Sequence, residues 1–376
     1  MQARNDVVDY LKKTFRVIFL GINIFSLLLL LSSFLAWNIS PERTTLLSYI
    51  GLGFSAILVV NILFLIFWIA LFNWKIVSLN VIVLLICYSP ISAYFPLNFT
   101  NKTVPENAIK VLSYNVRGAG WKLDKKWDEK HPMVQYLTSV DADIICMQEY
   151  MASTSDKHAS SRNLQKLLKK YPYFSEVPLR STRGGYIYGL VCFSKYPIVE
   201  TKKIPVESDD NGSALFKINM DGKIVHVVNN HLESNRLTSN DKKLYRDFFK
   251  EKGDAVKIND ITQNLENRLG VAYKKRAPQA NMIAQFAEDV SADAVIVCGD
   301  FNDTPISYTY RTISRNLEDA FVETGFGAGI TYHENHFWFR IDYILHSKNM
   351  KAYRFTVDKV KYSDHYPVWT YLSFKE

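Results

Sequence analysis

The sequence has three long stretches without a single charged residue, at 17–37, 48–72 and 76–95. An α-helix needs about 20 apolar residues to cross the ~30 Å hydrocarbon core of a bilayer, so each stretch is long enough to span one. The stretches also lack histidine, and proton relay or ion transport inside a membrane usually requires ionisable groups. The absence of charge therefore predicts three transmembrane helices that act as an anchor, and argues against a transporter.

Basic residues are scarce in the connections between the three stretches. Four of them precede the first stretch, and each connection has one: Arg4, Lys12, Lys13 and Arg16, then Arg43, then Lys75. The positive-inside rule places the N-terminus in the cytoplasm, and three crossings then place residues 96–376 on the periplasmic or extracellular side. A cleaved signal peptide is the alternative for the first stretch, but its apolar run is too long.

Cysteine is rare, and other common catalytic patterns are missing. The four cysteines have no spacing typical of zinc sites or disulfide frameworks, so we expect them to be small buried hydrophobic residues. No Gly-x-Ser-x-Gly sequence occurs, which argues against a serine hydrolase of the α/β type. The net charge of +8 divides into +4 for residues 1–104 and +4 for the remainder. Such a mild excess tolerates a polyanionic partner without requiring one.

The residues after the apolar stretches have the pattern of an ordinary soluble domain. We expect an anchor at 1–97, a polar linker at 98–107 and a second domain at 108–376. Short runs rich in Val, Ile and Tyr predict strands at 109–114, 142–147, 186–193, 224–229, 294–298, 341–345 and 367–372. Helical patterns occur at 133–139, 163–170 and 278–290, the last beginning at a proline that suits a first helical position. Alternating strands and helices predict a layered α/β domain.

Six groups of polar residues lie at the ends of predicted strands, either where a strand ends or where the next one begins. They are Asn115, Gln148–Glu149, Asn229–His231, Asp300 with Asn302, Arg340 with Asp342, and Ser363–His365. One such group is ordinary, but six groups of amides, acids and imidazoles predict a convergent site at one edge of a sheet. A calcium loop of the EF-hand type starting at Asp300 is excluded, because Pro305 and Arg311 occupy its glycine and glutamate positions.

Seven segments in this order resemble the endonuclease/exonuclease/phosphatase superfamily. They are SYNVRG (113–118), DIICMQE (143–149), GLVCFSKYPI (189–198), VVNNHLES (227–234), VCGDFND (297–303), RIDYIL (340–345) and SDHYPV (363–368). The resemblance covers 108–376 and implies a four-layered α/β (α+β) sandwich: two packed mixed β-sheets flanked by helices. It also implies hydrolysis of phosphate esters with a divalent metal, Mg²⁺ first and Mn²⁺ or Ca²⁺ as alternatives.

The same resemblance implies roles for individual residues. Glu149, with Asn115 and Asp364, would form the metal region, since a hard cation prefers oxygen ligands. Asp300 would activate the attacking water and Asn302 would position the phosphate. His365, oriented by Asp342, would stabilise the pentavalent phosphorus, and His231 would donate to the phosphate or the leaving oxygen. The substrate-binding residues would be Arg117, Asn229 and Arg183.

Several functions remain open on the sequence alone. The first hypothesis is a membrane-anchored nuclease, since the insert 234–276 has a net charge of +5 and basic residues alternate with aromatics at 119–132. A phospholipid or sphingomyelin head-group phosphodiesterase is the alternative, followed by a sugar or inositol phosphatase. A membrane-tethered binding module is the non-enzymatic hypothesis. The expected partners are the bilayer and a phosphate ester, with no obligate protein partner indicated.

Overall fold

Two six-stranded β-sheets form the centre of the molecule. The computed structural model describes residues 2–99, 103–118, 127–154, 160–182, 185–235, 263, 265–288, 291–334 and 337–375. The first sheet has the order β11 (Met350–Val357), β12 (Val368–Phe374), β1 (Ile109–Asn115), β2 (Ile144–Ser153), β4 (Tyr186–Ser194) and β3 (Tyr173–Thr182). The second has the order β5 (Ile198–Ile204), β6 (Gly212–Met220), β7 (Lys223–His231), β8 (Ala294–Asp300), β10 (Asp342–Ser347) and β9 (Leu317–Asp319).

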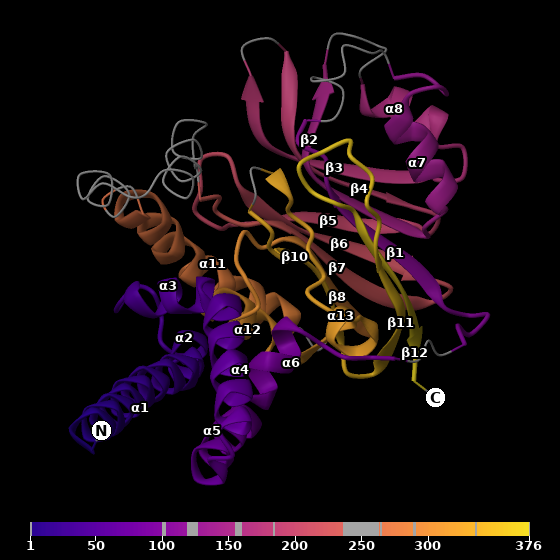
Figure 1. Cartoon of the computed structure of the whole chain (residues 1–376). Helices are drawn as coiled ribbons and strands as arrows, with labels where there is room; N and C mark the ends of the chain where they lie inside the picture. Colours follow the sequence, from indigo (N-terminus) through magenta and orange to yellow (C-terminus); the bar gives the residue numbers. More distant parts are fainter. Residues whose placement is uncertain are drawn as a thin grey trace.

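Each sheet is mixed in the same way. The pairs β1–β2 and β7–β8 are parallel, and every other pairing is antiparallel. The inner faces meet in a hydrophobic cluster that includes Val111, Ile144, Phe216, Val227 and Ile296, all fully buried. All four cysteines are free and buried, as expected. The predicted pair of packed mixed sheets is therefore confirmed (Figure 1).

Helices cover the outer face of each sheet. On the first sheet, α7 (Pro132–Val140) and α8 (Ser161–Leu167) pack Met133, Leu137 and Leu164 against Leu112 and Ile145. On the second, α11 (Val271–Ala287) and α12 (Tyr308–Ser314) cover the sheet, and α13 (Ala320–Thr324) follows β9. All these helices present apolar residues to a sheet that is apolar on both faces, which explains the four layers.

Pro278 does not begin a helix, contrary to the sequence prediction. A short π-helix, η2 (Leu265–Gly270), leads into α11, and Pro278 lies inside α11. A proline removes the hydrogen bond to the carbonyl four residues earlier. That carbonyl belongs to Lys274, and both Lys274 and Pro278 are exposed, so water can satisfy the freed group.

Among the residues that the structure describes, six N-terminal helices precede the sandwich. They are α1 (Gln2–Leu31), α2 (Ser33–Asn38), α3 (Leu46–Leu52), α4 (Phe54–Ala70), α5 (Trp74–Ile86) and α6 (Tyr88–Tyr94). The stretch Tyr10–Asn38 is long and apolar enough to cross a membrane, which indicates membrane association. The described residues contain up to three such spans if each of the bent pairs α3–α4 and α5–α6 counts as one.

The expected second and third spans are each bent by 63° near one end. The bend before α6 lies at Cys87, where Pro90 cannot donate a hydrogen bond to the carbonyl of Ile86. Figure 1 shows α1 and α5 projecting away from the sandwich, while α2 lies beside α12. The short helices therefore lie between the long apolar helices and the second sheet.

Candidate active site

Polar residues from both sheets meet at one edge of the sandwich. In the second sheet, Asp300 at the end of β8 lies opposite His231 on β7 and opposite Asp342 on β10. In the first sheet, Asn115 ends β1 beside Gln148 on β2. Because parallel neighbours end at the same edge, the strand-end residues singled out in the sequence come together.

Asn115 connects the two sheets at this edge. Its side-chain amide donates to Oδ2 of Asp300 at 3.0 Å and to Oε1 of Glu149 at 3.1 Å, while its Oδ1 accepts the backbone N–H of Arg117 at 3.1 Å. The side chain is almost completely buried. Its amide therefore fixes the positions of one carboxylate from each sheet.

Glu149 lies at an irregularity in β2. The pairing with β4 shifts register between Met147 and Tyr150, and Glu149 has a φ of +50°. The bulge turns its side chain toward the edge, where 26% of the side chain remains exposed. Burial works against the charged form, but the nearby His231 and the hydrogen bond from Asn115 hold the pKa of Glu149 below its usual value. The group is therefore a carboxylate that solvent can reach.

The turn after β8 shapes the GDFN segment. Gly299 has a φ of +121°, and a Cβ there would lie 2.0 Å from the carbonyl oxygen of Asn230, so only glycine fits. Asn302 donates its backbone N–H to Oδ1 of Asp300 at 2.8 Å and its side-chain amide to the carbonyl of Leu232 at 3.0 Å. Burial raises the pKa of Asp300 to about 6, although the His365 imidazolium opposes the shift.

His365 and Asp342 form a buried pair beside Asp300. Nδ1 of His365 lies 2.8 Å from Oδ2 of Asp342, so Nδ1 carries a proton and Nε2 faces Oδ2 of Asp300 at 3.6 Å. Burial disfavours the imidazolium, but the charges of Asp342 and Asp300 outweigh that effect and raise the pKa of His365 to about 10. The imidazole is therefore protonated at neutral pH.

His231 lies between the carboxylates of the two sheets. Its Nε2 is 3.6 Å from Oε1 of Glu149 and 3.8 Å from Oδ2 of Asp300. The amide of Asn211 contacts the imidazole ring at 3.1 Å and also donates to the carbonyl of Leu232 at 3.0 Å. Sequence reasoning missed Asn211, because it lies just before β6, a strand that was not predicted.

Two of the residues assigned from the resemblance, Asp364 and Asn229, make contacts other than the expected ones. Asp364 accepts from Arg117 at 2.8 Å, and Nη1 of Arg117 also pairs with Glu334 at 2.8 Å. Asn229 is a correction to the expected substrate contacts, since it is fully buried between the sheets and bonds Gln148 and the carbonyl of Met147. Arg183 lies outside the described residues.

Two sets of side chains at the site could attract a cation. Asp300, Asp342 and His365 offer ligand atoms within 4.8 Å of one another, but all three side chains are buried. Glu149 and Asn115 offer a solvent-accessible carboxylate and an amide oxygen, which are ligands suited to Mg²⁺. The donor chemistry therefore fits a metal at Glu149 rather than at His365.

The residues 112–365 match the model of the endonuclease/exonuclease/phosphatase family. Residues 16–94 match a family described only as a domain of unknown function. No protein with a curated description matches this chain.

The fold is similar to that of several solved structures. An endonuclease/exonuclease/phosphatase from Bacteroides vulgatus is 17% identical, with 72% of this chain and 100% of that chain covered and a TM-score of 0.51. A family protein from Bacteroides thetaiotaomicron is 18% identical, with 72% and 99% covered and a TM-score of 0.50. A mannosyl-6-phosphatase from Bacteroides thetaiotaomicron VPI-5482 is 17% identical, with 71% and 100% covered and a TM-score of 0.48. The two structures with TM-scores of 0.51 and 0.50 confirm the fold.

Proposed function

The chain belongs to the endonuclease/exonuclease/phosphatase family of phosphoesterases, and we propose that it hydrolyses phosphodiesters of lipid head groups with the help of a divalent metal. The observation that carries the phosphodiesterase proposal is the junction at Asn115. There, one amide holds Glu149 from the first sheet and Asp300 from the second. A single phosphate at this junction would contact groups from both sheets.

Glu149 and Asn115 are the residues that would hold the metal, with Mg²⁺ the first candidate. When bound, the cation would polarise a phosphoryl oxygen and neutralise charge that develops during hydrolysis. The low pKa of Glu149 supports this role, because a ligand must be deprotonated at neutral pH. Asp364, paired with Arg117, would keep that guanidinium oriented toward the phosphate instead of binding metal itself.

Asp300 is the proposed general base. With a pKa of about 6 it is ionised at neutral pH, yet basic enough to accept a proton from water. The backbone N–H of Asn302 donates to Oδ1 of Asp300, and the side-chain amide of Asn115 donates to its Oδ2. Both carboxylate oxygens are thus fixed before a substrate arrives, which limits reorganisation during the reaction.

His365 and His231 are the proposed donors to the phosphate. The Nδ1–H of His365 donates a hydrogen bond to Asp342, and its Nε2–H is directed into the site. There, the Nε2–H can stabilise an anionic oxygen of the phosphorane. His231 lies within 4 Å of Glu149 and Asp300, so it can donate to the phosphate or to the leaving oxygen. Asn211 holds the orientation of its ring.

The choice of a lipid head group rests on how near the site is to the membrane-associated helices. Nε1 of Trp37 donates to the carbonyl of Pro305 at 2.8 Å, and Trp37 lies one residue from the end of the apolar stretch Tyr10–Asn38. Pro305 is three residues from Asn302, a chain distance of at most about 11 Å. A site this close to the end of a span favours substrates held at the bilayer surface.

Exposed apolar side chains next to α6 support the same placement. Leu97 forms a bridge with Phe326, and Phe99 stacks edge-on against Phe326 with ring centroids 5.3 Å apart. All three are more than half exposed. Aromatic side chains just beyond a membrane span are typical of the interfacial region of a bilayer. The nuclease hypothesis, by contrast, drew mainly on residues outside the described ones.

The full chain, reconstituted in vesicles, provides the test. We expect Mg²⁺-dependent release of head groups from vesicles of phosphatidylcholine, phosphatidylethanolamine or sphingomyelin, abolished by EDTA. Cleavage of DNA or RNA without head-group release would support the nuclease alternative and refute the lipid proposal. A correctly folded protein that turns over no lipid, nucleic acid or soluble phosphodiester would refute the phosphoesterase activity altogether.

A further inference from the structure

We propose that the N-terminal helices position the active site, with Trp37 as the central positioning residue, instead of serving only as a tether. The inference rests on the proposed phosphoesterase function. Both segments that carry the catalytic carboxylates are fastened to these helices. The first begins at Asp300, the last residue of β8, and includes Asn302, and the second ends at Asp342, the first residue of β10.

The segment after β8 is held by α2 and α3. The bond from Trp37 to the carbonyl of Pro305 is buried, and Trp37 is only 5% exposed. One residue further, the carbonyl oxygen of Ile306 lies so near Gly51 that a Cβ on Gly51 would be 2.0 Å away. The backbone of α3 therefore contacts the segment after β8 directly, at Ile306, four residues after Asn302.

The segment before β10 is held by α6. Arg340 is buried and donates Nη2 to the carbonyl of Ala93 at 2.6 Å and Nη1 to Asp319 at 2.8 Å. Its Nε has no hydrogen-bond partner among the described residues, so the Ala93 carbonyl is one of few groups that compensate this buried charge. Arg340 is two residues before Asp342, which in turn orients His365.

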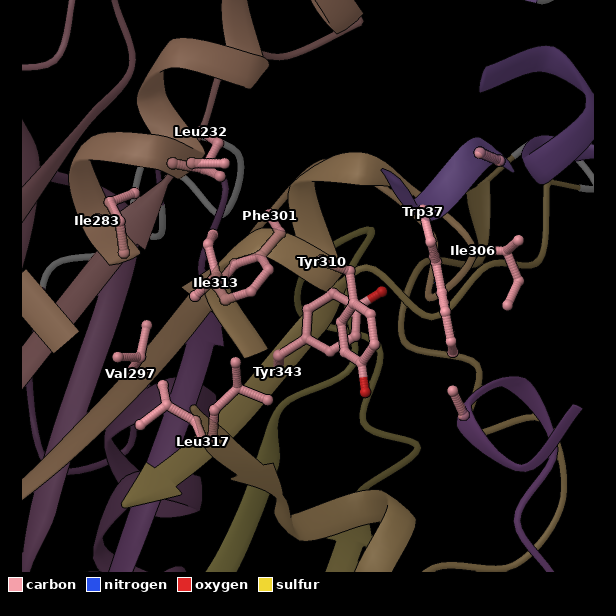
Figure 2. Packing of buried hydrophobic residues seen from close by; sticks show 14 of the residues in the cluster. Trp37, Leu232, Ile283, Val297, Phe301, Ile306, Tyr310, Ile313, Leu317 and Tyr343 are labelled. Carbon is pink, nitrogen blue, oxygen red and sulfur yellow. The ribbon is translucent and has the colours of Figure 1, made fainter. Parts of the chain in front are cut away.

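Tyr343 joins the two segments to each other. Its hydroxyl lies 2.8 Å from the carbonyl oxygen of Asp303 and 2.9 Å from that of Arg340. Figure 2 shows Trp37 and Ile306 in one cluster with Tyr310 and Tyr343, so the N-terminal helices complete the hydrophobic layer behind the site. Moving α2 or α6 would therefore move both catalytic segments together.

A simple tether predicts a different arrangement. A helix that only held the enzyme near a bilayer could attach anywhere on the sandwich, whereas these contacts lie two to four residues from Asn302 and Asp342. Catalysis is sensitive to such positions, since a displacement of about 1 Å can lower the rate by roughly 100-fold.

Trp37→Phe tests the inference in the full chain in vesicles. The variant keeps an aromatic ring but removes the donor to Pro305. Trp68→Phe is the matched control, since Trp68 is equally buried and its Nε1 donates to Asn23 at 3.0 Å within the N-terminal helices. We expect Trp37→Phe to lower kcat at least about tenfold with KM changed less than about twofold, and Trp68→Phe to leave kcat within about twofold. Equal losses in both variants, or full kcat in Trp37→Phe, would overturn the inference.

A second pair of variants covers the case in which Trp37→Phe does not fold. Gly51→Ala would push the carbonyl of Ile306 away, whereas Gly53→Ala places its Cβ 3.5 Å from the nearest atom, an ordinary contact. We expect Gly51→Ala to lower kcat and Gly53→Ala to leave it unchanged. Unchanged kcat in a folded Gly51→Ala protein would also contradict the inference.

Hydrogen exchange separates failure of this inference from failure of the proposed function. If the wild-type chain hydrolyses no phosphate ester, the function fails, but exchange at residues 300–306 and 340–342 still reports on the contacts. We expect faster exchange there in Trp37→Phe and Gly51→Ala than in Trp68→Phe and Gly53→Ala. Identical exchange in all four variants would refute the positioning role without reference to activity.

Discussion

The two sheets are built alike but differ in what covers them and in what they contribute to the site. Each has a parallel pair at its centre with antiparallel strands outside. Helices α7 and α8 pack on the outer face of the first sheet, whereas α11 and α12 share the outer cluster of the second sheet with the N-terminal helices. The first sheet supplies Asn115 and Glu149, and the second supplies His231, Asp300 and Asp342.

The two sheets therefore contribute different kinds of side chain to the site. The residues of the first sheet are suited to holding a cation, and those of the second sheet to moving protons. The second sheet is also the one that shares its outer hydrophobic cluster with the N-terminal helices. Substitutions in the two sheets should therefore affect different measurable quantities.

Asp300→Asn, in the second sheet, should have the largest effect. The amide keeps the shape of the side chain but cannot accept a proton from water, so kcat should fall by about 10²–10⁴-fold. Steady-state turnover under saturating Mg²⁺ measures the loss, and calorimetry should show nearly unchanged Mg²⁺ binding. Retention of more than half of the wild-type kcat would exclude Asp300 as the general base.

Glu149→Gln, in the first sheet, should mainly weaken the binding of Mg²⁺. Losing the only charged ligand of the proposed pair should raise the Mg²⁺ concentration for half-maximal activity at least about tenfold, while high Mg²⁺ restores part of the turnover. A titration of activity against Mg²⁺ measures the change, and direct calorimetry provides a readout apart from activity. An unchanged Mg²⁺ dependence would move the metal site elsewhere.

Asp342→Asn should shift the pH dependence of turnover. Asp342 helps to raise the pKa of His365 to about 10, and the imidazolium is present below that pKa. Removing the charge lowers the pKa, so the loss of kcat/KM on the alkaline side should begin at a lower pH. Asp364→Asn should shift the profile in the same direction by less, because Asp364 does not bond the imidazole. A shift to higher pH would contradict the assignment of His365 as an acid.

Leu137→Ala should have the smallest effect on turnover. Leu137 is fully buried on α7, behind the first sheet and away from the N-terminal helices. The cavity should lower the free energy of unfolding by about 2–5 kcal/mol while kcat stays within about twofold at 25 °C. Ile313→Ala, on α12, creates a similar cavity in the cluster shared with the N-terminal helices and should lower kcat as well. Denaturant unfolding and turnover of both variants test the contrast.

Much of the fold could be predicted from local patterns, for identifiable reasons. All seven predicted strands exist, because the buried strands are continuous apolar runs. The sequence did not predict β3, which contains Pro178, β5, in which Lys202 and Lys203 are exposed, or β9, which has three residues. It also did not predict β6 and β11, in which polar residues such as Lys217 and Lys351 interrupt the apolar run. Polar residues at strand ends indicated the site, but Asn211 had no such signal.

The sequence by itself determined the apolar stretches, the two buried strand sets and the order of the motifs that form the site. These depend on short-range periodicity and on residue types that only certain chemistry requires. Only the tertiary structure decided that Asn229 holds the sheets together, that Asp364 pairs with Arg117, and that Trp37 contacts the catalytic segment. Trp37 and Pro305 are 268 positions apart, and a hydrogen bond between them leaves no trace in local composition. It exists because the N-terminal helices and the residues after β8 pack into one hydrophobic core behind the second sheet.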